Sequence, residues 1–338
     1  MAKSILYVGN KLAKHGRTVS TIDSLSVLLE DGGYKVITAS SKKNKLGRLL
    51  DMIQKTIRYR NKVDLVLIDT YSTQNFYYAV IVAKLCRMFK IPYYTILHGG
   101  NLPKRLSENP KTSKKLFEGA KLNISPSLFL METFRNKGYN NITYVPNSIE
   151  LVNYNFFLRK EIRPKLLWVR SFAEIYNPML AIEVLKNLRE RGIDASLTMV
   201  GPDKDGSMER CKTEALRQQL PVIFTGKLEK LDWIELSKQH DIFINTTNFD
   251  NMPVSLIEAM ALGLPIISTN VGGIPFLVKN NETGILVHAN DIKLFTEAII
   301  DLLASPVLVE RLSKNGRALA ETFAWKEVKR KWHSLLSE

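Results

Sequence analysis

The chain of 338 residues is predicted to have an α/β fold with two domains, each built on a parallel sheet covered by helices on both faces. Short apolar runs rich in β-branched and aromatic residues alternate with helical patterns, which is typical of parallel sheets. This alternation occurs in two successive series, one in each half of the chain. A hydrophobic content of 45% at this length is enough for two cores.

The first half contains six predicted strands. They lie at residues 4–9, 34–40, 63–70, 92–100, 121–127 and 142–147. Helical patterns separate them, and one ends at the glycines of residues 32–33. A second helical pattern lies in the basic segment 42–62, where five apolar side chains share one stripe. We expect this stripe to face the core and the cations to face solvent. The stripe consists of Leu46, Leu49, Leu50, Ile53 and Ile57.

The second half repeats the scheme. Its predicted strands lie at residues 165–170, 196–201, 222–227, 241–247, 265–271 and 284–287. After the fourth strand, Pro253 is expected at the first helical position, and the helix should stop at Gly263. The tail from Ala324 is predicted to be a helix with Trp325 and Trp332 on its apolar stripe.

These patterns predict the domain boundaries. We expect an N-terminal domain over residues 1–155, a linker near 153–164, a C-terminal domain over 165–320 and a terminal helix over 321–338.

The charge is divided unevenly between the two halves. Residues 1–160 hold 26 Lys and Arg against 10 Asp and Glu, whereas residues 161–338 hold 22 against 23. Nearly all of the net charge of +15 therefore belongs to the N-terminal half. An excess confined to one half indicates an anionic partner rather than a general aid to solubility.

Cysteine usage and hydropathy indicate a cytoplasmic protein. Cys86 and Cys211 lie in different halves and form no disulfide framework, so a reducing compartment is expected. The first apolar run is too short for a signal peptide, and the apolar stretch 76–97 contains three cations. No metal is expected, because the histidines and cysteines lack zinc-ligand spacing. Asp203 and Asp205, which imitate a metal-binding Asp-x-Asp motif, are interpreted as part of a solvated turn.

The most informative segment is 241–287. It contains two carboxylates, Asp250 and Glu258, separated by seven residues, and a Gly-Gly turn at residues 272–273. The pattern places two strand ends and two helix starts at one edge of a sheet. In doubly wound folds this edge binds ligands.

This segment resembles the donor-site signature of the retaining glycosyltransferases of family 4. That signature is Glu-x7-Glu with Ala-Met-Ala, then Gly-x-Pro and Gly-Gly. Here it appears as Asp250-x7-Glu258, Ala-Met-Ala at 259–261, Gly-Leu-Pro at 263–265 and the Gly-Gly turn. The resemblance implies the GT-B fold of two facing Rossmann-like domains. The N-terminal domain would bind the acceptor and the C-terminal domain the nucleotide sugar, and the terminal helix would cross back onto the first domain.

The resemblance also assigns roles to individual residues. Arg170 would bind phosphate, Glu258 the ribose hydroxyls, and Asp250 and His98 the donor sugar. The turn formed by Gly272, Gly273 and Ile274 would offer backbone N–H groups to the diphosphate. Further donor-side positions are Gly201, Gly226, Lys227, Met252 and Pro253. The acceptor-side positions are Gly9, Asn10, Gly16, Gly99 and Gly100.

Each of the four principal residues also has a plain structural interpretation. Arg170 could be a surface ion-pair partner, Glu258 an exposed helix acid, Asp250 a turn cap and His98 a structural histidine.

The chain departs from the family pattern at three positions, of which Phe276, where the family often has glutamate, is interpreted as structural. Asp250 stands where glutamate is usual. Ile175 occupies the position five residues after Arg170 where the family commonly has a lysine. Phosphate neutralisation is therefore expected to depend on Arg170, the Gly-Gly turn and Lys227.

The expected function is metal-independent, retaining transfer of a sugar from a nucleotide-sugar donor to a glycan or lipid-linked acceptor, in cell-surface polysaccharide assembly. The nucleotide sugar is a co-substrate, and no other cofactor is implied. The alternatives are a GT-B-fold sugar-nucleotide epimerase and a non-catalytic protein that binds a sugar nucleotide or glycan.

The basic clusters at residues 42–62 and 104–121 are expected to meet the inner face of the cell membrane or an anionic lipid-linked glycan. Nucleic acid is not expected, because few aromatic residues are interleaved and no binding motif is present.

Overall fold

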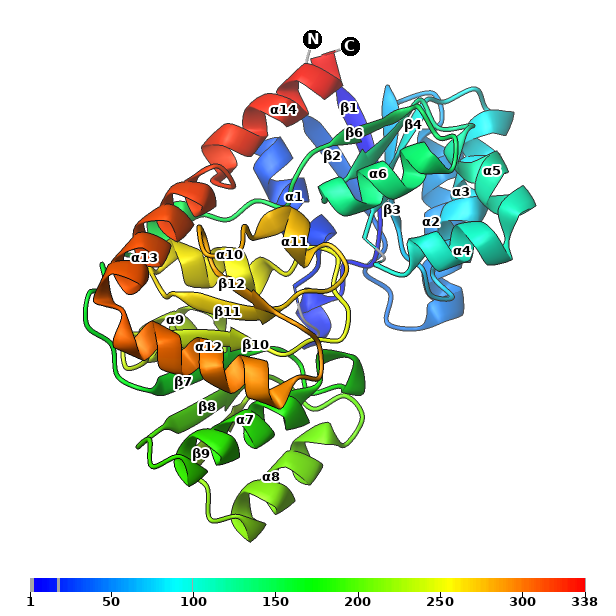
Figure 1. Cartoon of the computed structure of the whole chain (residues 1–338). Coiled ribbons are helices and arrows are strands. Elements are labelled where there is room, and N and C mark those ends of the chain that lie inside the picture. The colour runs from blue at the N-terminus through cyan, green and yellow to red at the C-terminus, as the bar shows by residue number, and fades with distance from the viewer. Residues whose placement is uncertain (1–2, 17–18, 99, 338) are drawn as a thin grey trace. The chain divides into compact units, whose positions relative to one another are not determined.

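The computed structural model describes residues 3–16, 19–98 and 100–337 and divides the chain into two compact units. Unit 1 comprises Met1–Pro146 and Lys329–Glu338, and unit 2 comprises Asn147–Val328 (Figure 1). Each unit contains one six-stranded sheet, and all strand pairs in both sheets are parallel within the described residues. The α/β fold class predicted from the sequence is therefore confirmed.

The sheet of unit 1 has the order β2-β1-β3-β4-β5-β6. Its strands are β1 (Ser4–Val8), β2 (Lys35–Ala39), β3 (Leu65–Thr70), β4 (Tyr93–Leu97), β5 (Leu122–Ser125) and β6 (Ile142–Tyr144). The strand order reverses between β1 and β3. The carboxyl ends of these two strands therefore form the topological switch point, where doubly wound sheets bind ligands.

Six helices and one short 3-10 helix of unit 1 connect these strands in the part of the chain that the structure describes. They are η1 (Ala13–His15), α1 (Thr21–Glu30), α2 (Lys45–Tyr59), α3 (Phe76–Met88), α4 (Leu102–Glu108), α5 (Pro110–Phe117) and α6 (Leu128–Asn136). The last helix, α14 (Trp325–Ser337), returns to unit 1. There the Tyr94 hydroxyl donates to the Leu335 carbonyl at 3.1 Å, and Tyr34 Oη lies 2.9 Å from His333 Nδ1.

The prediction that the stripe of α2 faces the core is wrong. The buried side chains of α2 are Arg48, Met52 and Thr56, whereas Leu46 and Leu50 are exposed. Arg48 fixes this rotation, because its Nη1 donates to Asn10 Oδ1 at 2.7 Å and its Nη2 to the Lys43 carbonyl at 3.2 Å. The helix therefore presents an apolar stripe to solvent.

The sheet of unit 2 has the order β12-β11-β10-β7-β8-β9. Its strands are β7 (Lys165–Val169), β8 (Ser196–Val200), β9 (Val222–Gly226), β10 (Ile242–Asn245), β11 (Ile266–Thr269) and β12 (Ile285–Val287). The order reverses between β7 and β10, which form the switch point of this unit. Each strand of both sheets lies inside a segment that the sequence predicts.

The helices of unit 2 cover both faces of its sheet. They are η2 (Leu151–Asn153), η3 (Glu174–Tyr176), α7 (Pro178–Glu190), α8 (Ser207–Arg217), α9 (Lys230–Ser237), α10 (Val254–Ala261), α11 (Ile274–Leu277), α12 (Ile292–Ala304) and α13 (Pro306–Glu321). Successive residues of β7 point to opposite faces. Leu166 and Trp168 therefore join one core with α7 and α12, and Leu167 joins a second core with α10.

The helix that carries Glu258 begins one residue later than predicted. Pro253 is the N-cap of α10, with a ψ of 112°, and Val254 is its first residue. The helix ends at Ala261, and Gly263 adopts a φ of +77° in the turn that leads to β11. Among the described residues, no helix combines the length and apolar character needed to cross a bilayer.

Candidate functional site

The switch point of unit 2 brings Arg170 and Asp250 together. Arg170 directly follows β7, and Asp250 lies in the loop after β10. Arg170 Nη2 and Asp250 Oδ2 form an ion pair, in which the two side chains are 21% and 10% exposed. The guanidinium carbon also lies 4.2 Å from the centroid of the Tyr176 ring. Arg170 Nε is buried and has no hydrogen-bond partner, so the guanidinium keeps a donor that protein groups do not use.

Two threonines tie the loops after β7 and β10 together. Thr246 Oγ1 accepts from Trp168 Nε1 at 3.0 Å and donates to the Asn177 carbonyl at 2.8 Å. Thr247 Oγ1 donates to the Ile175 carbonyl at 3.1 Å. The loop that carries Ile175 is thus hydrogen-bonded to the loop that carries Asp250.

Three glycines allow the backbone to pack closely around this ion pair. A Cβ on Gly201 would lie 1.8 Å from the Arg170 carbonyl oxygen, and φ of Gly201 is +150°. A Cβ on Gly272 would lie 2.2 Å from the Asp250 carbonyl oxygen, and one on Gly273 would lie 1.8 Å from the Asn251 carbonyl oxygen. Any larger residue at these positions would displace the segments that hold Arg170 and Asp250.

Two of the three backbone N–H groups that the resemblance assigns to the diphosphate are hydrogen-bonded within the Gly-Gly turn. The Gly273 N–H donates to the Asp250 carbonyl at 2.9 Å, and the Ile274 N–H donates to the Val271 carbonyl at 3.1 Å. The helix that follows, α11, has only four residues. These two N–H groups therefore stabilise the turn and are not available to a diphosphate in this conformation.

Glu258 is buried in α10 and has two donors on one oxygen. Its Oε1 accepts from the Tyr154 hydroxyl at 2.7 Å and from Lys230 Nζ at 2.5 Å. Burial, and then the neighbouring Glu258 charge, raise the pKa of Tyr154 well above its usual value. Glu258 is therefore not the exposed helix acid of the plain structural interpretation.

Sequence analysis missed Lys230. It is the first residue of α9, which follows β9 at the carboxyl edge of the sheet. The predicted cation Lys227 instead pairs with Glu229 at 2.9 Å on the surface. Lys230 could have been identified from its position, because it lies three residues after Lys227 in the same strand-to-helix turn.

The remaining positions predicted in unit 2 have structural roles in the fold. Met252 and Ile274 are buried in the second core of the unit. The Gly226 carbonyl accepts from the Gly201 N–H at 2.8 Å. Asp203 Oδ1 accepts from the Gly206 N–H at 3.0 Å, and Asp205 Oδ2 accepts from the Glu174 N–H at 2.8 Å. These two acids therefore hold a turn, as the sequence predicts. Within the described residues, no group of three metal-ligating acids, histidines or cysteines occurs.

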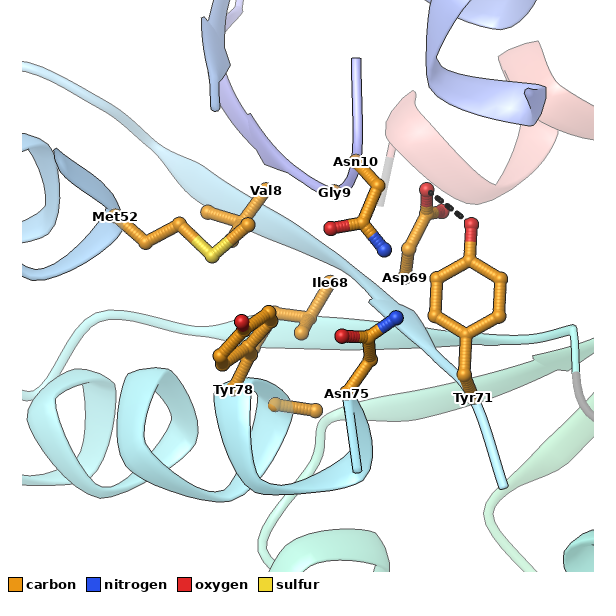
Figure 2. Close-up of a pocket in the computed structure, with 10 residues that line it drawn as sticks. Val8, Gly9, Asn10, Met52, Ile68, Asp69, Tyr71, Asn75 and Tyr78 are labelled. Atoms are coloured by element: carbon orange, nitrogen blue, oxygen red, sulfur yellow. Dashed lines mark hydrogen bonds between the residues drawn. The ribbon is translucent and has the colours of Figure 1, made fainter. Parts of the chain in front are cut away.

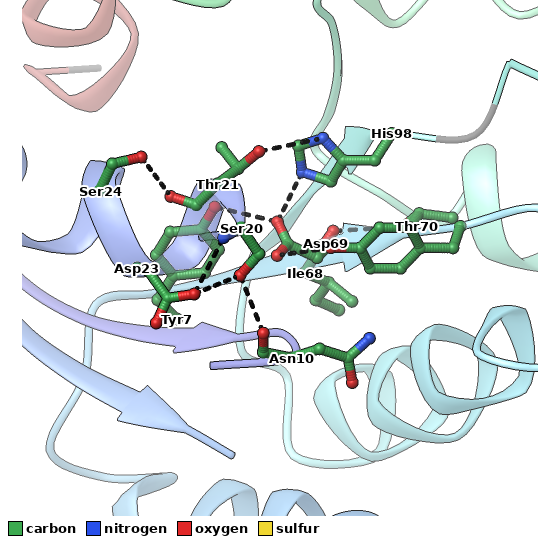
Figure 3. Close-up of polar contacts among 11 residues, drawn as sticks. Tyr7, Asn10, Ser20, Thr21, Asp23, Ser24, Ile68, Asp69, Thr70 and His98 are labelled. Atoms are coloured by element: carbon green, nitrogen blue, oxygen red, sulfur yellow. Dashed lines mark hydrogen bonds and ion pairs between the residues drawn. The ribbon is translucent and has the colours of Figure 1, made fainter. Parts of the chain in front are cut away.

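The switch point of unit 1 is organised by Asp69, a second residue that sequence analysis missed. Its buried carboxylate accepts from the Tyr7 hydroxyl at 2.9 Å and lies 2.7 Å from His98 Nε2 (Figure 3). The Tyr71 hydroxyl is 3.5 Å from its other oxygen. Burial, and then the Asp69 charge, raise the pKa values of Tyr7 and Tyr71 well above their usual range. Asp69 could have been predicted as a site residue, because it is an acid near the end of the apolar strand β3.

The predicted residues Gly9 and Asn10 border a small pocket at this switch point (Figure 2). A Cβ on Gly9 would lie 2.3 Å from Asp69 Oδ2, so glycine leaves room for the carboxylate. The Asn10 carbonyl accepts from Ser20 Oγ at 2.8 Å, which ties the loop after β1 to the N-cap of α1. Gly16 ends η1 with a φ of +70°, and Gly100 lies in the turn before α4. Gly99 lies outside the described residues.

Comparison with known proteins relates much of unit 2 to a sequence family. Residues 154–319 match the sequence profile described as glycosyl transferases group 1. This segment of the chain belongs to that family. The matched residues include Arg170, Asp250 and Glu258, and thus the whole switch point of unit 2.

Two curated relatives align with about half of this chain. The spore coat protein SA of Bacillus subtilis is 29% identical over 50% of this chain and 50% of its own length. The UDP-Gal:alpha-D-GlcNAc-diphosphoundecaprenol alpha-1,3-galactosyltransferase of Escherichia coli is 27% identical over 52% of this chain and 48% of its own length. The chain thus spans about half the length of these relatives.

The solved structure of HepE of Anabaena in complex with UDP and glucose shares the fold. It aligns with a TM-score of 0.78 over 99% of this chain and 100% of that chain, at 16% sequence identity. The GT-B type of fold expected from the sequence is therefore confirmed.

Tyr7 offers a test of the Asp69 network. Replacing Tyr7 by phenylalanine is expected to lower the free energy of unfolding by about 2 kcal/mol near neutral pH, because a buried carboxylate loses a donor. The raised pKa of Tyr7 adds stability that is present below about pH 10 and lost as the pH rises above it. Unfolding by urea at several pH values should therefore show a shallower alkaline decline in the Tyr7→Phe variant.

The matched control for Tyr7→Phe is Tyr77→Phe, because Tyr77 is half-exposed on α3 of the same unit. This change should leave both the stability and its pH dependence close to those of the wild type. Equal effects of the two substitutions would contradict the account of Asp69.

Proposed function

We propose that this protein is a glycosyltransferase that transfers a sugar from a nucleotide-sugar donor to a glycan or lipid-linked acceptor, with retention of configuration and without a metal. The observation that carries the proposal is the Arg170–Asp250 ion pair at the switch point of the group 1 domain, with the buried Arg170 Nε unpartnered. The ligands that two relatives' names specify, UDP for HepE and UDP-Gal for the Escherichia coli enzyme, support a nucleotide-sugar donor.

Arg170 and Lys230 would supply the positive charge of the donor site. The leaving diphosphate gains negative charge in the transition state, and a fixed guanidinium stabilises that charge without reorganising. Lys230 would take the place of the lysine that the loop after Arg170 lacks. Glu258 would accept hydrogen bonds from the ribose hydroxyls, since its carboxylate is already oriented by Tyr154 and Lys230.

The configuration of the sugar would be retained because the diphosphate leaves from the same face of the sugar that the acceptor attacks. A diphosphate oxygen would take the acceptor proton. No dedicated base is then required. In unit 1, we assign the acceptor to the switch point at Gly9 and Asn10. There Asp69 holds the imidazole of His98 through Nε2, and His98 would meet the donor sugar. The lipid-linked acceptor in the name of the Escherichia coli relative supports polysaccharide assembly as the setting.

The proposal includes a cytoplasmic location at the inner face of the cell membrane. Cys86 and Cys211 are buried free thiols, and burial raises the pKa of each to about 12, which suits a reducing compartment.

A thermal-shift panel of UDP-, GDP-, ADP- and CMP-sugars, with and without EDTA, tests the donor site. A nucleotide at 100 times its Kd should add about 2.7 kcal/mol of stability. We expect a shift with one base that EDTA leaves unchanged, followed by release of that nucleotide when acceptor is added. The anomeric proton signal of the product should report retention.

The panel also separates the alternatives. An epimerase would convert the nucleotide sugar without an acceptor. A non-catalytic binding protein, which Asp250 and Ile175 would suit, would show the shift without turnover. The absence of a shift with every nucleotide would contradict the proposed donor site.

A further inference from the structure

Helix α2 exposes an apolar stripe that nothing in unit 1 covers among the described residues. We call Leu46, Leu50, Ile53 and Ile57 the α2 stripe. Leu46 is 66% exposed, Leu50 57% and Ile57 38%, while Ile53 is half-buried. At about 100° per residue, the four positions lie within about 60° of one another on the helix. The face that packs on the sheet is a different one, formed by Arg48, Met52 and Thr56.

Cations flank both ends of the α2 stripe. Lys42, Lys43 and Lys45 are exposed at the start of the helix, and Arg58, Arg60 and Lys62 are exposed at its end. The single acid in this segment, Asp51, pairs with Lys55 at 3.3 Å. The stripe therefore lies in a surface of strong and uncompensated positive charge.

The charge of the whole unit has the same sign. Unit 1 holds 27 Lys and Arg against 10 Asp and Glu, a net charge of +17, whereas unit 2 holds 21 against 23, a net charge of −2. Helix α3 packs against both α2 and α5 (Figure 1). Helix α5 adds the exposed Lys111, Lys114 and Lys115. The positive surface thus continues beyond α2.

We propose that the α2 stripe and its flanking cations dock unit 1 on an anionic lipid surface. A helix with apolar side chains on one face and cations around them binds in the interface of a bilayer, where the apolar groups enter the acyl boundary and the cations meet anionic headgroups. Charge complementarity favours this occupant over a protein. The leucines favour it over nucleic acid, which is bound through phosphate, base-edge and stacking contacts.

This inference deepens the proposed function, because a membrane-docked unit 1 would meet a lipid-linked acceptor. The inference rests on the proposed function only for the reason why the protein would bind a membrane. Lipid binding can be measured without any donor, acceptor or turnover, so the two ideas fail separately.

The test is flotation of the full chain with vesicles of phosphatidylcholine alone and of phosphatidylcholine mixed with phosphatidylglycerol. We expect binding to the mixed vesicles only. Changing both Leu46 and Leu50 to serine should lower the partition coefficient by about tenfold or more, because two apolar side chains no longer insert. Changing Lys42 and Lys43 to glutamine should lower it by about tenfold at low salt.

The matched control is Leu216→Ser, which removes a leucine that is 81% exposed on α8 of the nearly neutral unit 2. This variant should bind vesicles like the wild type. The substituted side chains are exposed, so circular dichroism and the nucleotide thermal shift should be unchanged in every variant.

Four results would overturn the inference. They are equal binding to both kinds of vesicle, binding to neither, unchanged binding after loss of Leu46 and Leu50, and a dimer in light scattering that the leucine change dissociates while vesicle binding is absent. The last result would identify the stripe as a protein interface.

Discussion

Replacing Arg170 by alanine is expected to lower kcat/KM of sugar transfer by about 100- to 1000-fold, the usual effect of removing one preorganised donor at a developing negative charge. The substitution also leaves the partly buried Asp250 carboxylate without its cation. A bound diphosphate would then face an anion where it now faces an ion pair. The measurement is nucleotide release at low donor concentration, with the donor that the thermal-shift panel selects.

Arg163 provides the control for Arg170. It lies just before β7, its side chain is 73% exposed, and its Nε is 3.5 Å from Asp241 Oδ2. An exposed pair of this kind contributes about 1 kcal/mol or less. Arg163→Ala should therefore leave kcat/KM within about fivefold of the wild type. An Arg170→Ala variant that behaves like Arg163→Ala would place the phosphate site elsewhere.

Replacing Gly201 by alanine is expected to lower the free energy of unfolding by about 3 kcal/mol or more, because a strained backbone and a steric clash act together. The new Cβ would lie 1.8 Å from the Arg170 carbonyl oxygen, and φ of Gly201 is +150°. Urea unfolding measures the loss. Any surviving folded protein should also bind the nucleotide more weakly, since Arg170 must shift.

Gly206 is a matched control for Gly201. It also has a positive φ, +83°, but a Cβ there would meet nothing within 4 Å. Gly206→Ala should therefore cost about 1 to 2 kcal/mol, the penalty of the left-handed backbone alone. If the two alanine variants lose equal stability, the close approach at Gly201 has no energetic importance.

The strands were predictable because parallel strands covered on both faces consist of nearly continuous apolar residues. The segment around Asp250 and Glu258 was predictable because strand ends and helix starts in such a sheet meet at one edge. Both features depend on local pattern and chain order, which the sequence contains.

The remaining features depend on contacts between distant segments. The rotation of α2 is fixed by Arg48 and Asn10, which are 38 residues apart. Lys230 reaches Glu258 across 28 residues, and Asp69 binds Tyr7 across 62. The amides of Gly273 and Ile274 are engaged because the chain folds back on Asp250 and Val271. No spacing rule along the sequence contains such pairings.

The most direct test of the central claim is a crystal structure with the stabilising nucleoside diphosphate bound. We expect the diphosphate within hydrogen-bonding distance of the Arg170 guanidinium, and the ribose hydroxyls on the Glu258 carboxylate. A nucleotide whose diphosphate contacts neither Arg170 nor Lys230, or whose ribose lies away from Glu258, would contradict the account.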